Sequence, residues 1–195
     1  MLPFILSLLI ILLFPMAFVN GSSNETPLGN TNTVITGSND VTTIDINLPS
    51  YKKLNPLWPK FNGQCTWFAW SRANQICGVK MPTRDAKYWY ELAKGMGFKV
   101  GSTPSKNSVM VITGSTYGHV AFIEAYDGKN ITVSEGNVNW TNSSYKPSSG
   151  SVGVGTWAPD SEVIKHIRVS SHNFEQYRKD LLARGRRIAG FIYAE

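Results

Sequence analysis

The residues of this chain best suited to chemistry are Cys65, His119 and the polar pair Glu135 and Asn137. A thiol, an imidazole and a carboxylate or amide are the groups that catalysis by a cysteine nucleophile requires. The imidazole takes the thiol proton, and the third group fixes the orientation and tautomer of the ring. Each residue taken alone also has a structural interpretation, as an inert buried cysteine, a histidine at a strand end or a polar loop residue. The elements that carry these residues must therefore bring them together.

Cys65 lies in the run Phe61–Trp70, where a loop enters an aromatic-rich segment. Asn62 and Gly63 suit a helix start, and we predict a helix of about three turns that ends at Gly78. In the first turn of that helix, unpaired backbone amides and the helix dipole favour a thiolate at Cys65. Helical spacing predicts an inward face made of Cys65, Ala69, Ala73 and Ile76.

His119 begins a predicted strand that forms a β-hairpin with the segment containing Glu135 and Asn137. A three-residue loop, 127–129, gives a register that pairs Tyr126 with Asn130, Ile123 with Val133, Ala121 with Glu135, and His119 with Asn137. The polar trio His119, Glu135 and Asn137 then lies at one end of an otherwise apolar, buried face, where polar groups usually have partners or a function. A two-residue turn would instead pair His119 with Gly136, so the prediction depends on loop length.

Three blocks of the sequence resemble the CHAP domains, the cysteine, histidine-dependent amidohydrolases and peptidases. Gly63-Gln-Cys-Thr-Trp-Phe is similar to the nucleophile block, Gly118-His-Val-Ala-Phe-Ile-Glu to the histidine block, and Ser134-Glu-Gly-Asn to the acidic block, in the same order and spacing. The resemblance implies that Cys65 is the nucleophile, His119 the base and Glu135 the orienting carboxylate, with Asn137 as a supporting polar group. Residues 190–193 resemble the last strand of the family, so the similarity covers residues 56–195.

The resemblance implies a papain-like α+β fold, in which an N-terminal helix carrying the nucleophile packs on an antiparallel sheet or half-barrel. It also implies a peptidoglycan hydrolase that cleaves an amide bond, as an N-acetylmuramoyl-L-alanine amidase or as a peptide endopeptidase. The backbone amide of Cys65 would form part of an oxyanion site, with Gln64 as a candidate second donor. Two other hypotheses stay open: a catalytically silent wall-binding module, and an amidase that acts on a non-wall peptide conjugate.

Metal ions and cofactors are not expected. Some phage members of the family bind calcium through aspartates just ahead of the cysteine, but residues 51–64 contain no acidic residue, and a hard cation needs several oxygen ligands. The cysteines and histidines show no paired spacing of the kind that zinc sites use. A disulfide between Cys65 and Cys77 is also disfavoured, because the predicted helix would hold them about 18 Å apart.

The chain divides into three predicted regions. Residues 1–19 are almost wholly apolar and uncharged, a length between the core of a signal peptide and a membrane span, so we predict a signal peptide or membrane anchor at 1–21. Either interpretation exports the domain, which would be secreted or anchored facing outward. Residues 22–55, rich in Ser, Thr, Asn and Gly, predict a flexible linker, and residues 56–195 the catalytic domain.

The formal net charge of +6 favours approach to anionic cell-wall polymers. Nucleic acid is not an expected partner, because no aromatic platform or binding motif accompanies the arginines at 184–187. An extra stretch, 158–187, separates the acidic block from the last strand; its part 174–187 predicts a surface helix rich in Arg and Lys, with no role implied by the family. Five tryptophans could line a substrate groove: Trp67, Trp70, Trp89, Trp140 and Trp157. Trp67 and Trp70 form a helical pair, for which packing is the more usual role.

Overall fold

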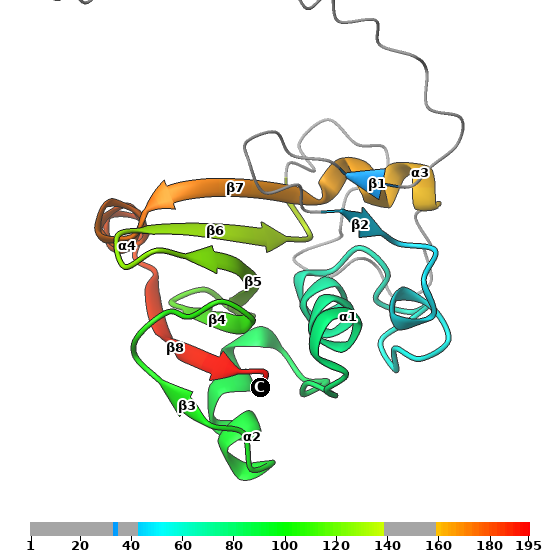
Figure 1. Ribbon diagram of the computed structural model, residues 1–195, viewed down its shortest axis with the longest axis horizontal. Helices are drawn as coiled ribbons and strands as arrows, with labels where there is room; N and C mark the ends of the chain where they lie inside the picture. The colour runs from blue at the N-terminus through cyan, green and yellow to red at the C-terminus, as the bar shows by residue number, and fades with distance from the viewer. Residues whose placement is uncertain (1–32, 35–42, 139–158) are drawn as a thin grey trace, which may run out of the picture. The chain divides into compact units, whose positions relative to one another are not determined.

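A computed structural model describes residues 33–34, 43–138 and 159–195 of the chain (Figure 1). The elements, in chain order, are β1 (Thr33–Val34), β2 (Ile44–Asp45), η1 (Pro49–Tyr51), α1 (Cys65–Cys77), η2 (Ala86–Tyr88), α2 (Trp89–Gly95), β3 (Val100–Gly101), β4 (Ser108–Thr113), β5 (His119–Tyr126), β6 (Asn130–Glu135), α3 (Asp160–Val163), η5 (Ile164–His166), β7 (Arg168–Asn173), α4 (Phe174–Ala183) and β8 (Arg187–Tyr193). The segment 1–21, predicted as signal peptide or anchor, lies outside the described residues, as do Trp140 and Trp157. Within the described part of the chain, no helix combines the length and apolar character needed to span a membrane.

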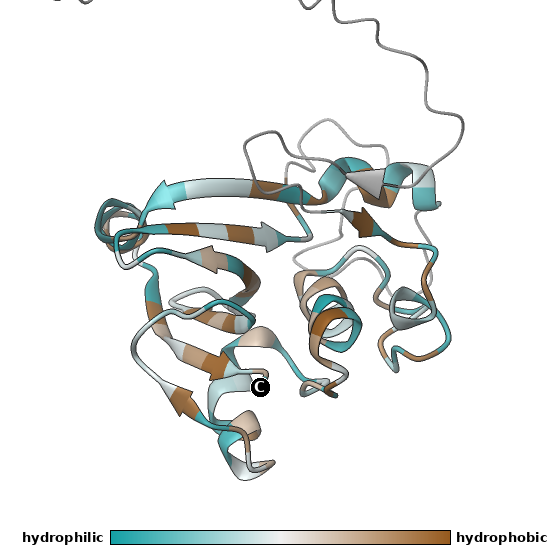
Figure 2. Ribbon diagram, viewed as in Figure 1, coloured by the Kyte–Doolittle hydropathy of each residue, from teal (hydrophilic) through white to brown (hydrophobic). Residues whose placement is uncertain are grey.

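The centre of the domain is a six-stranded antiparallel sheet with the order β3-β8-β4-β5-β6-β7. Alternate residues of its strands enter two separate apolar clusters, because successive side chains of a strand point to opposite faces. Val120 and Phe122 pack with helix α1 on one face, whereas Ala121 and Ile123 pack with Leu181 of α4 on the other. Figure 2 shows apolar segments along the strands. The predicted α+β class, with the cysteine helix packed on an antiparallel sheet, is confirmed.

Helix α1 begins at Cys65 and ends at Cys77, close to the predicted bounds. Gly78 follows it in the left-handed conformation, with φ 71°, which glycine adopts without steric cost. The predicted inward face is correct except at Ile76, which is 44% exposed. The groove hypothesis for three of the tryptophans is wrong: Trp67, Trp70 and Trp89 are 0–1% exposed and belong to the core.

The segment just before α1 corrects the predicted linker boundary. Ile44, Ile46 and Tyr51 are fully buried, and the indole Nε1 of Trp67 donates a hydrogen bond to the Tyr51 carbonyl at 3.0 Å. The polar composition of residues 22–55 concealed these few apolar side chains, which suffice to order residues 43–55 against α1. Residues 22–32 and 35–42 lie outside the described residues.

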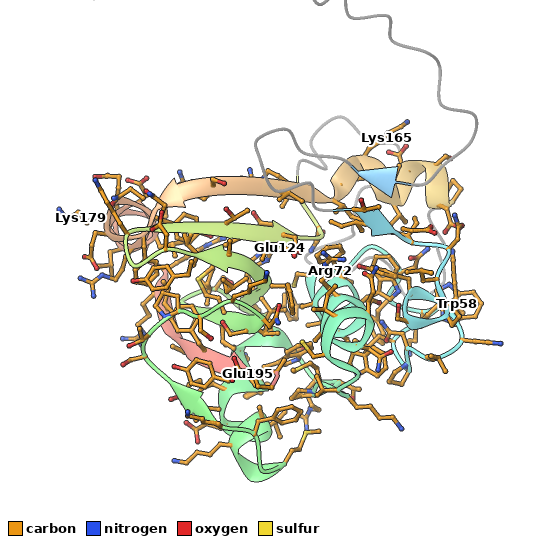
Figure 3. All side chains as sticks on the ribbon, viewed as in Figure 1. Trp58, Arg72, Glu124, Lys165, Lys179 and Glu195 are labelled. Atoms are coloured by element: carbon orange, nitrogen blue, oxygen red, sulfur yellow. The ribbon has the colours of Figure 1, made fainter. Side chains whose placement is uncertain are left out.

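A buried ion pair joins α1 to the sheet. The Arg72 guanidinium donates from Nε and Nη2 to the two carboxylate oxygens of Glu124, at 2.8 and 2.9 Å. Its Nη1 also donates to the Thr43 carbonyl at 3.1 Å, and Ser134 Oγ donates to Glu124 at 2.5 Å. The two labelled side chains meet between the helix and β5 (Figure 3). One arginine therefore connects the N-terminal segment, the cysteine helix and the sheet.

The β5–β6 hairpin has the predicted register toward the site but not at its turn. Ile123 pairs with Val133, as predicted. Tyr126, however, lies opposite Ile131 instead of Asn130, so the three-residue loop is wrong. The error is one residue, which would place every side chain of β6 on the other face if it persisted along the strand.

A turn and a bulge explain this difference. The Asp127 carboxylate accepts hydrogen bonds from the backbone amides of Lys129 and Asn130, at 2.8 and 2.6 Å, which lengthens the turn. The register then shifts back between Ile123 and Ala125, where Glu124 occupies a β-bulge. The bulge restores the predicted alternation in the half of the hairpin that leads to the site.

The stretch 158–187 adds an edge strand and a helix. Strand β7 pairs with β6, with Arg168 opposite Glu135 and Asn173 opposite Asn130. The predicted surface helix is confirmed as α4, whose N-cap residue Asn173 accepts a hydrogen bond from the Gln176 amide at 3.1 Å. The helix ends at Ala183, earlier than predicted, because the chain turns there into β8.

Candidate active site

Cys65 is the first residue of α1 and is 6% exposed. Burial by itself raises the pKa of its thiol, but the imidazole of His119 lowers it through both charge and a hydrogen bond, and the backbone amides of Val120 and Thr66 add to this effect. The net result is a pKa below the ordinary value of a cysteine. The thiol is therefore placed for ionisation at the start of a helix, as the sequence predicted.

His119 is the first residue of β5, and its Nε2 lies 2.6 Å from Oε2 of Glu135. Burial lowers the pKa of the imidazole, but the neighbouring Cys65 and Glu135 together raise it to about 10. Gly118 directly before it has φ 76°, and a Cβ at this position would lie 2.5 Å from the backbone nitrogen of Lys87. A glycine here thus lets the start of β5 approach η2 closely and places His119 beside Cys65.

Glu135 ends β6 and is 3% exposed. Its Oε2 contacts His119, whereas its Oε1 accepts hydrogen bonds from Arg168 Nη2 at 2.6 Å and Arg168 Nε at 3.2 Å. Burial raises the pKa of the carboxyl, yet these two partners lower it to about 2. The carboxylate is therefore ionised and held on both oxygens, as an orienting group must be.

Sequence reasoning missed Arg168. The residue lies in the stretch to which the family resemblance assigns no role, and nothing in its own neighbourhood marks it. Strand β7 brings it directly opposite Glu135, and an opposite charge on a paired strand would have been the signal. That signal becomes readable only when the pairing of β7 with β6 is known.

Asn137 and Gln64 contact each other at the opening of the site. Asn137 Nδ2 donates to Gln64 Oε1 at 3.0 Å, and Asn137 has a left-handed backbone with φ 65°, which asparagine tolerates well. A Cβ at Gly136 would lie 2.7 Å from Cβ of Phe68, so glycine is needed where this loop crosses α1. The imidazole of His119 contacts Glu135. Asn137 instead contacts Gln64, the residue just before Cys65 at the start of α1.

Two cavities flank the Cys65–His119 contact. The first, of about 270 Å³, has Cys65, Gln64, Phe61, Arg84, Tyr117 and Asn137 in its wall. The second, of about 280 Å³, includes His119, Glu135 and Asn137, and most of its other lining residues belong to β7, α4 and the turn after α4. Asn137 lines both, so the two cavities adjoin at the site.

The thiol and imidazole predict a distinctive pH dependence. Cys65 should react with an alkylating reagent at lower pH than an ordinary cysteine, because its lowered pKa favours the thiolate while His119 still carries its proton. The rate should fall as pH decreases through the lowered pKa of Cys65. Above a pH of about 10 the imidazolium loses its proton and the thiolate its cationic partner. Mass-resolved alkylation rates measured across pH would test this.

Cys77 provides the internal control. Burial raises the pKa of its thiol, so it should react only at more alkaline pH. Replacing His119 by alanine should shift the Cys65 profile toward that of Cys77. Identical profiles for the two cysteines in the parent protein would contradict an ion pair at the site.

Comparison with known proteins agrees with this geometry. Residues 57–137 match the family model described as CHAP domain. A probable autolysin, SsaALP, of Staphylococcus aureus (strain NCTC 8325 / PS 47) is 39% identical over 124 residues, which cover 62% of this chain and 42% of that protein. The staphylococcal secretory antigen ssaA2 of the same strain is 26% identical over 113 residues, 58% of this chain and 37% of that protein. The chain thus spans less than half the length of these relatives.

Solved structures give weaker similarity. An N-acetylmuramoyl-L-alanine amidase from Staphylococcus aureus has a TM-score of 0.41 at 22% identity, covering 66% of this chain and 30% of that one. Ly7917 with the hydrolyzing product of MDP has a TM-score of 0.41 at 17% identity, covering 68% and 53%. The family match extends over the part of the chain that carries the cysteine, histidine and acidic blocks. Residues 57–137 of the chain are therefore similar to a CHAP domain.

Proposed function

We propose that this protein is a peptidoglycan hydrolase that cleaves an amide bond by nucleophilic attack of Cys65. The observation that carries the proposal is the continuous chain of contacts from the Cys65 thiol through His119 to Glu135, beside an open cavity. The CHAP family match supports a hydrolase, and the name of the relative SsaALP, a probable autolysin, supports the cell wall as the substrate.

In this mechanism the thiolate of Cys65 attacks the amide carbonyl, and His119 then donates its proton to the leaving amine. Water, deprotonated by His119, hydrolyses the resulting thioester. The Cys65 backbone amide is at the helix start, where amides have no partner within the helix. The Gln64 side chain accepts from Asn137 through Oε1, which leaves its Nε2 as a donor. The Cys65 backbone amide and Gln64 Nε2 would together stabilise the oxyanion. Glu135 orients the imidazole.

Export and wall contact are parts of the same proposal. Residues 1–21 would act as a signal peptide or as a membrane anchor, and the secretory name of the relative ssaA2 is consistent with an extracellular or surface location. The net charge of +6 would favour anionic cell-wall polymers as partners. Residues 22–32 would tether the domain, because β1 already pairs with β2.

Digestion of purified peptidoglycan tests the function. The full chain and its Cys65→Ala variant are incubated with the polymer, and released fragments are identified by mass spectrometry. Fragments from the parent alone would support the proposal, and the new termini would distinguish cleavage between sugar and peptide from cleavage within the peptide. Binding to the polymer without fragments from either protein would instead favour a silent wall-binding module, and neither binding nor fragments would redirect the search to non-wall conjugates.

Arg168 should act as a positioning residue. Replacing it by glutamine removes the charge that holds Glu135 Oε1, so the carboxylate and imidazole lose their alignment with the thiol. We expect kcat to fall roughly 10- to 100-fold, with a smaller change in KM. Because Arg168 helps to lower the pKa of Glu135, the acid limb of the pH profile should also move to higher pH.

Arg178→Gln is the matched control for this prediction. Arg178 also pairs with a glutamate, Glu175, but both side chains are more than half exposed on α4. Its replacement should leave kcat and the pH profile unchanged. An Arg168→Gln variant with a normal acid limb would argue that Arg168 serves stability alone.

A further inference from the structure

The second cavity, of about 280 Å³, has an unusually basic wall. It lies between the acidic end of β6, the edge strand β7 and helix α4, and His119 and Glu135 form its side toward Cys65. Its remaining ionisable lining residues are Arg168, His172, Tyr177, Asp180, Arg184 and Arg186. Three guanidinium groups thus face one cavity directly behind the proposed catalytic histidine.

The arginines exceed the acidic partners available to them. Glu135 is already bound by His119 and Arg168, and Oδ1 of Asp180 accepts a hydrogen bond from Gln176. Arg184 and Arg186 form no ion pair with any residue that the structure describes. Even with the Asp180 carboxylate in the same wall, an excess of positive charge next to the site is therefore left for a ligand.

The backbone that carries these two arginines is firmly held. The amides of Arg184 and Arg186 both donate to the Leu181 carbonyl, at 3.0 and 2.9 Å. Gly185 between them has φ 68°, and its carbonyl packs so closely on Gly114 that a Cβ at Gly114 would overlap it. The turn is thus fixed against the strand β4 end, and the arginines are presented from a rigid base.

Neutral donors complete the wall. Burial raises the pKa of the Tyr177 phenol to about 12, so its hydroxyl keeps its proton. Its ring packs on His172 with centroids 4.7 Å apart, and burial together with Arg168 lowers the pKa of His172, which is therefore neutral at physiological pH. A protonated phenol and two arginines thus supply hydrogen-bond donors suited to an oxyanion.

The location determines what the oxyanion belongs to. Asn137 lines both cavities, so a group bound in the second cavity is close to a scissile bond placed at Cys65. Guanidinium groups bind carboxylates and phosphates in a matching planar geometry. A site for a free anion would not need to adjoin the Cys65 cavity. A substrate with a charged substituent near its scissile amide would occupy both cavities at once.

We infer that this cavity, built by β7 and α4, is a subsite that binds an anionic oxygen group of the wall polymer, either a peptide-stem carboxylate or a polymer phosphate. The inference rests on the proposed function. It gives the stretch 158–187 a role that the family motifs do not supply: β7 and α4 select substrates that carry a negative charge beside the cleaved bond.

The test compares the double variant Arg184→Gln/Arg186→Gln with a matched double variant, Arg178→Gln/Lys179→Gln. The control pair lies on α4 itself, where Lys179 points away from the sheet (Figure 3). The substrates are a synthetic muropeptide with free stem carboxylates and the same compound with those groups amidated. The parent should prefer the carboxylate form, and the Arg184/Arg186 variant should lose about tenfold in kcat/KM on that form alone.

A second arm distinguishes the two sources of the anion. Cell walls with and without their phosphate polymers are digested by the same proteins, and inorganic phosphate is added as a competitor. Sensitivity of the parent, but not of the Arg184/Arg186 variant, to the phosphate polymer would assign the subsite to phosphate. Selectivity for the free carboxylate would assign it to the peptide stem, and equal behaviour of parent and variant on all substrates would overturn the inference.

Binding to the Cys65→Ala protein separates this inference from the proposed function. Calorimetry with the carboxylate muropeptide needs no turnover, so binding that weakens on adding Arg184→Gln/Arg186→Gln would support the subsite even if the parent cleaves nothing. Cleavage by the parent with no effect of the arginines on binding or rate would leave the hydrolase intact and remove the subsite.

Discussion

Replacing Cys65 by alanine should reduce peptidoglycan cleavage by roughly 10⁴-fold or more, because the nucleophile of a covalent mechanism has no substitute. The expected change is in kcat, since the cavity walls that contact substrate are unaltered. Fragment release measured over time, with purified polymer in excess, would give the ratio of the two rates.

The folded state should survive this substitution. Cys65 is a small side chain at the start of α1, so its truncation removes little packing, at a cost of about 1 kcal/mol. Cys77→Ala is the matched control, because it removes the other thiol of the same helix from a half-buried position. It should retain full activity, and cleavage that persists in Cys65→Ala but fails in Cys77→Ala would refute the assignment.

Glu135 and Asn137 should differ in importance. The imidazole of His119 contacts Glu135, whereas Asn137 contacts Gln64. Replacing Glu135 by glutamine should therefore reduce kcat more than replacing Asn137 by alanine.

Replacing Glu124 by alanine should lower the free energy of unfolding by about 3–5 kcal/mol, since it leaves the Arg72 guanidinium buried without its counter-charge. The side chains of Arg72 and Glu124 are only 5% and 10% exposed. The variant also loses the acceptor of Ser134 and loosens the helix that carries Cys65. Urea unfolding followed by circular dichroism would measure the change.

A double variant and a surface variant make the Glu124 prediction specific. Arg72→Met/Glu124→Leu removes both charges and should recover much of the lost stability, because apolar replacements of a buried ion pair are often tolerated. Glu175→Ala breaks the exposed pair with Arg178 and should change stability little. If Glu124→Ala were no more destabilising than Glu175→Ala, the ion pair would not be what holds α1 on the sheet.

Local features of the site were readable from the sequence because they depend on neighbouring residues. The stop of α1 at Gly78 follows from helix-terminus preferences. The pairing of Ile123 with Val133 followed from alternation along the strands. The same reasoning failed at the turn, where hydrogen bonds to Asp127 lengthened the loop and a bulge at Glu124 compensated.

Other features were decided only by tertiary structure. Burial of Ile44 and Tyr51 against α1 ordered a segment whose composition resembles a linker. A second face of the sheet became apolar core because α4 covers it. The composition of a segment is an average over its residues. It therefore does not reveal that a few apolar side chains pack against residues far away in the sequence.

The sequence alone therefore predicted which groups would do the chemistry, since Cys65, His119 and Glu135 lie in short blocks whose helix and strand geometry is local. Tertiary structure alone decided what surrounds them. Arg168 reaches Glu135, and Arg184 and Arg186 reach the second cavity, only because β7 joins the sheet edge and α4 folds back over it. Such contacts depend on strand pairing between segments far apart in the chain, and no spacing within either segment encodes the partner that it meets.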